Sequence, residues 1–239
     1  YVKCGRLPSS GCGENFIGRA RDGGREVQLL RVEVQADRLE AVRAELESLA
    51  ARSRDVDAPG AAVVKAVVPE ARAVWVVGRR VAGTTAGQWM VHNGRFPPEA
   101  VLEIARQMAA TLAACEAADI RHGDLSVRTL VLTDEGQVVL PLPGVRGIAR
   151  PEEGPTFADL QPEGYDTLAP ERIADGTGVT AASELYAVAA VWWHLLAGRA
   201  PRGGGTSAAK LRAAQTGRVP DIRSVARDTA DVLASVLMS

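Results

Sequence analysis

The sequence predicts an α+β protein of two lobes, a small antiparallel β lobe that contains one helix and a larger α-helical lobe. Residues 5 to 32 contain short β-type runs joined by glycine-containing turns, a pattern typical of antiparallel strands. Beyond residue 83 the apolar residues recur mainly at helical spacing. We therefore expect the small lobe over residues 1–78, a connector at 79–83 and the helical lobe over 84–239.

Within the small lobe we expect three strands, one helix and two further strands. Leucine and valine recur every three or four residues among Glu and Arg from about Asp37 to Ala51, which predicts an amphipathic helix. Two β-rich runs follow, Ala61–Val68 and Ala73–Val77, with Pro69 and Glu70 between them.

The helical lobe is expected to begin with a long helix that starts at Pro97-Pro98 and reaches about Ala118. Three further helical patterns lie near 181–197, 207–216 and 226–238. The stretch Val145–Thr167 is rich in Pro, Glu and Gly, so we expect it to be irregular.

The composition is that of an ordinary globular protein. Apolar residues make up 46% of the 239 residues, charged residues make up 24%, and the net charge is -1. This balance supplies no basic field that would attract nucleic acid or anionic lipid, so we expect neither as a partner. The longest apolar run, Leu185–Leu196, is far shorter than the roughly 20 residues of a membrane span, and it predicts a buried helix.

The three cysteines indicate a reducing, cytoplasmic setting. Cys4, Cys12 and Cys115 are odd in number and widely spaced, without a CxxC pair, which argues against a disulfide framework and a zinc site. The first residue is Tyr1 and not Met, so we expect a piece of a longer protein. Membrane tethering through segments outside this piece is left open.

Several short motifs occur in a characteristic order along the chain. A polar loop, His122–Leu125 (HGDL), precedes a hairpin and then Leu142–Gly144 (LPG). Leu168–Arg172 (LAPER), Ala182–Ala187 (ASELYA) and Leu195–Pro201 (LLAGRAP) follow. Together these motifs resemble those of bacterial serine/threonine protein kinases, whose signatures include His-Arg-Asp-Leu-x-x-x-Asn, Asp-Phe-Gly and Ala-Pro-Glu. The resemblance covers essentially the whole chain and implies a kinase-like two-lobed fold.

The resemblance also implies that the metal ligands of the family are missing. Kinases hold Mg²⁺ with the Asp of Asp-Phe-Gly and with the Asn of the loop, and these positions correspond to Leu142 and Thr129. Leucine offers no oxygen to a cation that needs oxygen ligands, and the neutral Thr129 hydroxyl is a weak substitute. Gly144 keeps the family's glycine. We expect no metal and no ordinary binding of ATP.

The phosphate-pairing lysine of the family has no clear counterpart. Matching its strand to Val27–Leu30 places Leu30 at the lysine position, whereas a shift of one residue would place Arg31 there. Neighbouring strand residues face opposite sides, so only one of the two can point into the cleft, and Leu30 is our interpretation. The helix glutamate that would pair with the lysine corresponds to Glu45, which we expect to be an exposed charge.

The glycine-rich phosphate loop is also degenerate in this comparison. Its three glycine positions correspond to Ser10, Cys12 and Asn15. Gly11 and Gly13 lie out of phase, although a one-residue insertion would bring them into place. An ordinary glycine-containing hairpin is the expected structure.

Asp124 is the one residue that keeps a catalytic identity, because it matches the base that accepts the substrate hydroxyl proton. We expect it to be vestigial and His122 to be buried and structural. Gly123 replaces the family's Arg. Glu184 replaces an Asp that caps the loop, and its extra methylene is expected to shift the loop. Glu171 is expected to lack its usual Arg partner, which comes from a later helix.

We interpret the chain as a pseudokinase that binds or regulates other proteins, with no cofactor and with an unidentified protein partner. Three alternatives stay open. The first is an atypical phosphoryl- or nucleotidyl-transferase that holds ATP in an altered pose, with charge from Arg31, Lys65 or Arg128. The second is a nucleotide sensor that binds ATP without metal. The third is a small-molecule phosphotransferase, which also carries His-Gly-Asp but lacks an Ala-Pro-Glu segment.

Overall fold

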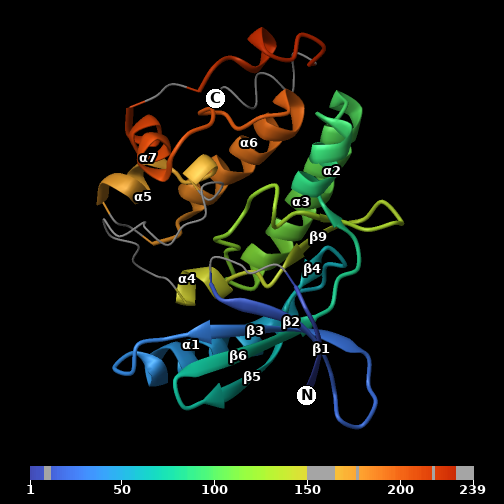
Figure 1. The fold of residues 1–239 in the computed structure, drawn as a ribbon, viewed down its shortest axis with the longest axis vertical. Helices are drawn as coiled ribbons and strands as arrows, with labels where there is room; N and C mark the ends of the chain where they lie inside the picture. The colour runs from blue at the N-terminus through green and yellow to red at the C-terminus, as the bar shows by residue number, and fades with distance from the viewer. Residues whose placement is uncertain (8–11, 150–164, 176–177, 217–218, 230–239) are drawn as a thin grey trace.

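The computed structural model describes residues 1–7, 12–149, 165–175, 178–216 and 219–229. These residues form two lobes, one dominated by strands and one dominated by helices (Figure 1). A single long helix packs on the sheet of the strand-rich lobe. The predicted α+β two-lobed fold is therefore confirmed.

Five antiparallel strands form the small lobe, in the order β1-β2-β3-β6-β5. They are β1 (Val2–Arg6), β2 (Glu14–Arg19), β3 (Glu26–Glu33), β6 (Ala73–Arg79) and β5 (Val64–Glu70). Helix α1 (Leu39–Arg52) follows β3, and a 3₁₀ turn at Ser53–Asp55 ends it. The predicted succession of three strands, a helix and two strands is confirmed.

The strand register decides which side chains face α1. Leu30 of β3 lies opposite Val76 of β6, and the next pair, Arg31 and Trp75, points to the other face of the sheet. Leu30 and Val76 are buried in one apolar cluster with Leu46 of α1. The inner face of the sheet thus forms the core of the small lobe with α1, and the outer face carries Arg31.

A second sheet joins the two lobes, with the strand order β4-β9-β8-β7. Its strands are β4 (Ala61–Ala62), β9 (Val138–Pro141), β8 (Val131–Leu132) and β7 (Thr84–Thr85). Leu140 N donates to Gly60 O at 2.7 Å and Leu142 N donates to Ala62 O at 2.8 Å, so β4 runs parallel to β9. The single strand predicted over 61–68 is therefore two strands, because β4 pairs with β9 whereas β5 pairs with β6.

Helices make up most of the larger lobe. They are α2 (Ala86–Asn93), α3 (Pro98–Ala117), α5 (Pro170–Asp175), α6 (Ala181–Ala197) and α7 (Ser207–Thr216), with a 3₁₀ turn at Ile222–Ser224. The Thr180 side chain caps α6 by accepting a hydrogen bond from Ser183 N, and Gly198 ends it in the left-handed conformation. The predicted helices near 97–118, 181–197 and 207–216 are confirmed.

The core of the larger lobe forms between α6 and α3. Trp193, Leu195 and Leu196 of α6 are fully buried in one cluster with Val101 and Met108 of α3. The apolar run of α6 is therefore largely buried, as predicted, although its first residue, Leu185, is 69% exposed and others, such as Trp192, are only partly buried. Among the described residues, no helix is both long and apolar enough to cross a membrane.

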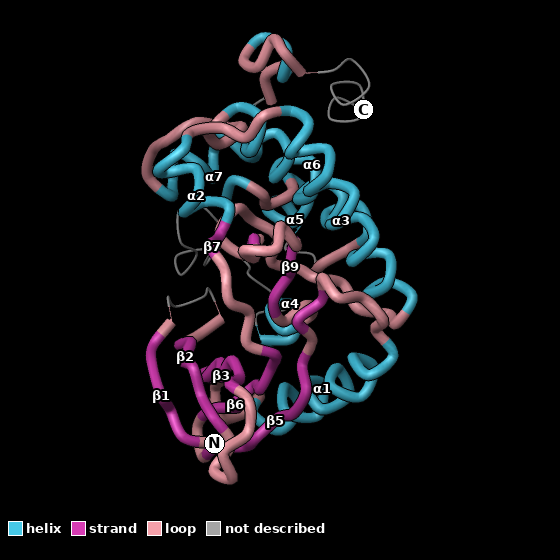
Figure 2. Tube along the Cα trace, turned by 90° about the vertical axis from the view of Figure 1, so that its right-hand side faces the viewer, coloured by secondary structure: helices cyan, strands magenta, loops and turns pink. Residues whose placement is uncertain are grey.

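Two predicted segments differ from the structure. The stretch predicted to be irregular begins with a short helix, α4 (Val145–Ala149), because Val145 and Ala149 lie one turn apart and are both buried against the small lobe. Residues 226–229 form a turn where we predicted the start of a helix over 226–238, and residues 230–239 lie outside the described residues. Helix α4 lies between the two lobes in both views (Figures 1 and 2).

Candidate functional site

The loop around Asp124 is held from within by His122. The side chain of His122 is 1% exposed, and its Nδ1 accepts a hydrogen bond from Asp124 N at 3.2 Å. Burial lowers the pKa of His122 to about 4, against the opposing effect of a backbone hydrogen bond at Pro141. The ring is therefore neutral at physiological pH, and the hydrogen bond that it accepts from Asp124 N supports the loop.

Glu184 of α6 holds the same loop from the other side. Its Oε1 accepts a hydrogen bond from Gly123 N at 3.0 Å, so Glu184 caps the loop despite its extra methylene. Burial raises the pKa of Glu184, and backbone hydrogen bonds from Gly123 and His122 oppose that effect. Gly123 has a φ of +76°, and a Cβ there would lie 3.0 Å from Val179 Cγ2. Only glycine fits this position without strain.

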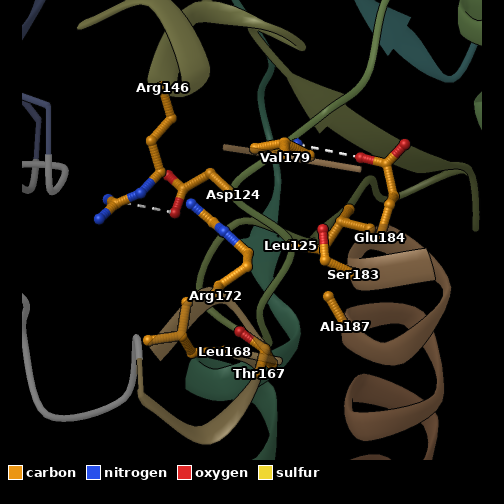
Figure 3. Close-up of a pocket in the computed structure, with 11 residues that line it drawn as sticks. Asp124, Leu125, Arg146, Thr167, Leu168, Arg172, Val179, Ser183, Glu184 and Ala187 are labelled. Atoms are coloured by element: carbon orange, nitrogen blue, oxygen red, sulfur yellow. Dashed lines mark hydrogen bonds and ion pairs between the residues drawn. The ribbon is translucent and has the colours of Figure 1, made fainter. Parts of the chain in front are cut away.

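The Asp124 carboxylate lies beside the guanidinium of Arg146, a residue of the same chain. Arg146 Nη1 lies 3.5 Å from Asp124 Oδ1, and the two side chains are 7% and 29% exposed. Figure 3 shows Arg146 extending from α4 to Asp124 and Arg172 of α5 pointing toward the same carboxylate. The retained carboxylate is therefore engaged by an arginine that the sequence interpretation did not include.

The hydroxyl of Thr129, which we placed at the second metal-ligand position, is turned into the loop. Its Oγ1 donates to Asp124 O at 2.6 Å and accepts from Ser126 N at 2.9 Å. These bonds link residues at the two ends of the turn. The Thr129 hydroxyl thus stabilises the loop by hydrogen bonds to its backbone.

Leu142, which we placed at the first metal-ligand position, packs into the interior. It is 7% exposed and lies against Gly78 of β6 so closely that a Cβ on Gly78 would collide with Leu142 Cδ2. Its φ of +51° is unusual for a branched residue. Gly144 has a φ of +85° and packs against Leu49, where a Cβ would lie 2.9 Å from Leu49 Cδ1.

Cys12 and Leu30, at two of the positions that the resemblance gives to phosphate binding, are buried apolar residues. Cys12, Leu30 and Leu142 belong to one buried cluster, and Leu30 is 2% exposed. Of the two residues that the sequence left open, Leu30 faces this interior, whereas Arg31 faces outward and pairs with Glu33 at 2.5 Å and Glu70 at 2.8 Å.

Of the other predicted site residues, Glu45 lies on α1 and Asn15 lies on β2, opposite Leu30 of β3. Glu45 is exposed on α1. Asn15 is buried and its Oδ1 accepts a hydrogen bond from Gln28 Nε2 at 3.2 Å, so it supports the hairpin of β2 and β3. Ser10 lies outside the described residues. Within the part of the chain that the structure describes, no group of three or more His, Cys, Asp or Glu side chains could hold a metal ion.

A pocket opens beside Asp124, between the loop, α4, α5 and α6 (Figure 3). Arg146 and Arg172 line it together with Leu168, Val179 and Ala187. The sequence interpretation missed Arg146 and Arg172. Arg172 is the last residue of LAPER and Arg146 lies two residues beyond LPG, but nothing in the sequence indicated that their side chains converge on Asp124.

Comparison with known proteins identifies relatives that match most of the chain. No protein-family model matches it. It is 31% identical over 217 residues to the serine/threonine-protein kinase PkaB of Streptomyces coelicolor, an alignment that covers 86% of this chain and 50% of PkaB. It is 26% identical over 198 residues to the kinase AfsK of Streptomyces griseus, covering 82% of this chain and 24% of AfsK. The chain therefore spans half or less of the length of these relatives.

Solved structures share the fold. The kinase domain of PknI from Mycobacterium tuberculosis superposes with a TM-score of 0.73 at 20% identity, covering 100% of this chain and 87% of that chain. Rad53 in complex with AMP-PNP superposes with a TM-score of 0.74 at 18% identity, covering 98% and 59%. The fold is that of a protein kinase domain. The chain is a homologue of bacterial serine/threonine protein kinases, as its motifs predicted.

Proposed function

We propose that this domain is a pseudokinase, which keeps the kinase fold, transfers no phosphate and acts by binding or regulating other proteins. One observation carries the proposal. Leu30 and Leu142, at the positions that the resemblance gives to the phosphate-pairing lysine and the metal-binding aspartate, lie in one buried apolar cluster.

The chemistry of phosphoryl transfer explains why this observation matters. A kinase has little covalent work to do, because catalysis depends on positioning the nucleotide and neutralising charge on the phosphates. Removal of one such electrostatic group typically costs about 100- to 1000-fold in rate, and groups that act as a unit are not additive. Leu30, Leu142 and Thr129 stand at the positions that the resemblance gives to the lysine, the metal-binding aspartate and the metal-binding asparagine. These three residues supply none of the expected cations or metal ligands.

A protein-binding role is supported by what the chain retains. The loop keeps its internal support through His122, Glu184 and Thr129, although the phosphate-binding groups are replaced. A folded domain that catalyses no reaction can still present surfaces to a partner. We further propose that the domain has no cofactor and that its partner is a protein.

The alternative of an altered ATP pose finds little support in the described residues. Arg31 lies on the outer face of the sheet and is paired with Glu33 and Glu70. Lys65 is exposed on β5, and Arg128 is exposed in the loop. No observation therefore favours these three cations as phosphate ligands.

A transfer assay tests the proposal. Purified protein is incubated with γ-labelled ATP, a general protein substrate, and Mg²⁺ or Mn²⁺, and Asp124→Asn serves as the comparison. We expect no metal-dependent label above that of the variant. Metal-dependent transfer that Asp124→Asn abolishes would contradict the proposal, and nucleotidyl or phosphoryl groups found by mass spectrometry on the protein itself would favour the altered-pose enzyme.

A further inference from the structure

One wall of the pocket beside Asp124 comes from residues 165–172. Thr167, Leu168 and Arg172 of this segment line the pocket (Figure 3). The same segment leads into α5, which lies beside α7 in both views of the fold (Figures 1 and 2). The contacts between this segment and α7 therefore decide where the wall stands.

A buried ion pair joins the segment to α7. Lys210 Nζ donates to both carboxylate oxygens of Asp166, at 2.9 and 2.7 Å. The two side chains are 9% and 3% exposed, so the pair is shielded from water. Hydrogen bonds between charged groups are roughly twice as strong as those between neutral groups. The pair thus fixes the position of Asp166 relative to α7.

A second cation holds the same segment two residues further on. Arg202 Nη1 donates to Leu168 O at 3.2 Å, and Arg202 Nη2 donates to the hydroxyl of Tyr186 on α6. The guanidinium also lies over the Tyr186 ring, 5.1 Å from its centroid. Arg202 therefore joins the backbone of the segment to α6.

Apolar packing accompanies these bonds. Tyr165 and Leu168 are almost fully buried, and Ile173 of α5 and Leu211 of α7 pack against them. The residues before and after Thr167 are thus fixed to α6 and α7 both by hydrogen bonds and by packing.

Asp166 has a second cation nearby. Burial lowers the pKa of Arg202, and the charges of Tyr186 and Asp166 oppose that effect. Asp166 therefore acts on Arg202 as well as on Lys210. Replacement of Lys210 removes two directed hydrogen bonds to the segment and leaves the charge of Arg202 in place, so we expect the segment to loosen while the rest of the domain stays folded.

We propose that Lys210 and Arg202 are positioning residues that hold residues 165–172 as a fixed wall of the pocket. Neither residue lines the pocket, so each acts through the segment that it binds. The wall then has its shape before any partner binds. This role goes beyond the proposed function, because it concerns how the pocket is held and not whether phosphate is transferred.

Hydrogen exchange followed by mass spectrometry tests this role in the whole domain. We expect Lys210→Met to speed amide exchange over residues 165–175 by roughly tenfold or more, because two charged hydrogen bonds to the segment are lost. Lys210→Arg keeps a cation that can donate to Asp166 and should restore most of the protection. Arg95→Met is the matched control, because it breaks a pair with Asp228 that also has two bonds, at 2.9 and 3.0 Å, but is exposed elsewhere in the same lobe.

Helix α3 shows whether the effect is local. Its peptides should exchange at the wild-type rate in Lys210→Met, since opening of the segment leaves the core between α3 and α6 intact. Equal acceleration in α3 and at 165–175 would indicate general unfolding and would overturn the positioning role. Wild-type exchange at 165–175 in Lys210→Met would overturn it as well, and so would exchange in Lys210→Arg as fast as in Lys210→Met.

Arg202→Met provides a second test. It removes the bonds to Leu168 O and to Tyr186 while the Lys210 pair stays, so exchange over 165–175 should again rise. Combined with Lys210→Met it should speed exchange more than either change alone, because the two side chains bind different residues of the segment. If Lys210→Met does not fold, Arg202→Met decides: local acceleration supports the role, and unchanged exchange overturns it.

The outcome is separate from that of the transfer assay. Metal-dependent transfer would contradict the pseudokinase proposal, whereas the exchange measurements report on the wall of the pocket whatever the activity. Conversely, a domain without transfer whose residues 165–175 ignore both substitutions would retain the proposed function and lose the fixed wall.

Discussion

The hydroxyl of Thr129 donates a 2.6 Å hydrogen bond to the carbonyl of Asp124. The residue that we placed at a metal-ligand position therefore stabilises the loop that contains Asp124. The same oxygen accepts from Ser126 N at 2.9 Å. A side chain engaged in this way stabilises the loop. Its replacement should therefore affect folding before it affects any chemistry.

Thr129→Val should lower the free energy of unfolding by about 1–3 kcal/mol, because the isosteric valine leaves the Ser126 N–H without its partner inside the loop. Urea denaturation followed by circular dichroism measures the change. Thr129→Ser keeps the hydroxyl and serves as the control. Equal stability of the valine variant and the wild type would show that the loop does not depend on this hydroxyl.

Leu30→Lys should restore the family's residue and still give no activity. The ammonium group would enter an apolar cluster that contains Cys12 and Leu142, and we expect a loss of about 3 kcal/mol or more in stability. Leu30→Met, which conserves volume, should cost less than about 1.5 kcal/mol. Thermal unfolding compares the two variants. A lysine variant as stable as the methionine variant would mean that the interior is open to water.

Gly123→Ala should destabilise the domain more than Gly136→Ala does. Both glycines have a φ of +76°, so alanine is strained at either position. At Gly136 nothing lies within 4 Å of an added Cβ, whereas at Gly123 the Cβ would lie 3.0 Å from Val179 Cγ2. The difference between the losses of unfolding free energy in the two variants measures the effect of the close approach to Val179. Equal losses would mean that Val179 moves away freely.

Stability should rise with pH between about 4 and 6.5. Burial lowers the pKa of His122 to about 4, and burial, followed by the charge of Lys210, lowers that of His194 to about 4. In this window the unfolded chain binds protons that the folded chain does not, so each histidine adds a slope of up to about 1.4 kcal/mol per pH unit. Unfolding free energies measured across this range give the slope.

His194→Gln should reduce the slope because it removes one of the two rings whose pKa is lowered. The exposed His92 supplies the control substitution, His92→Gln. A slope that both variants leave unchanged would locate the pH dependence in other groups.

Much of the fold could be predicted because apolar residues recur at a regular spacing along its helices and strands. The helices at 181–197 and 207–216 and the succession of strands in the small lobe follow from the spacing of apolar residues. Strand alternation predicts that only one of Leu30 and Arg31 faces inward, and the choice of Leu30 came from matching Val27–Leu30 to the family's strand. These features depend on residues close together in the sequence.

The features that could not be predicted depend on contacts between distant segments. Helix α4 has only five residues, and its burial depends on Leu49 of α1, almost 100 positions earlier. Lys210 is buried against Asp166, with Nζ–Oδ2 at 2.7 Å, although 44 positions separate them. Nothing in the local pattern around Arg146 or Lys210 indicates its partner.

Nucleotide binding tests the central claim most directly, because we propose that the buried cluster of Leu30, Leu142 and Cys12 leaves no place for phosphates. The melting temperature is measured with millimolar ATP, once with Mg²⁺ and once with EDTA. A ligand present at 100 times its Kd stabilises the folded state by about 2.7 kcal/mol, which is readily detected. We predict no rise under either condition. A rise that requires Mg²⁺ would contradict the account, and a rise that persists in EDTA would indicate a metal-independent nucleotide sensor.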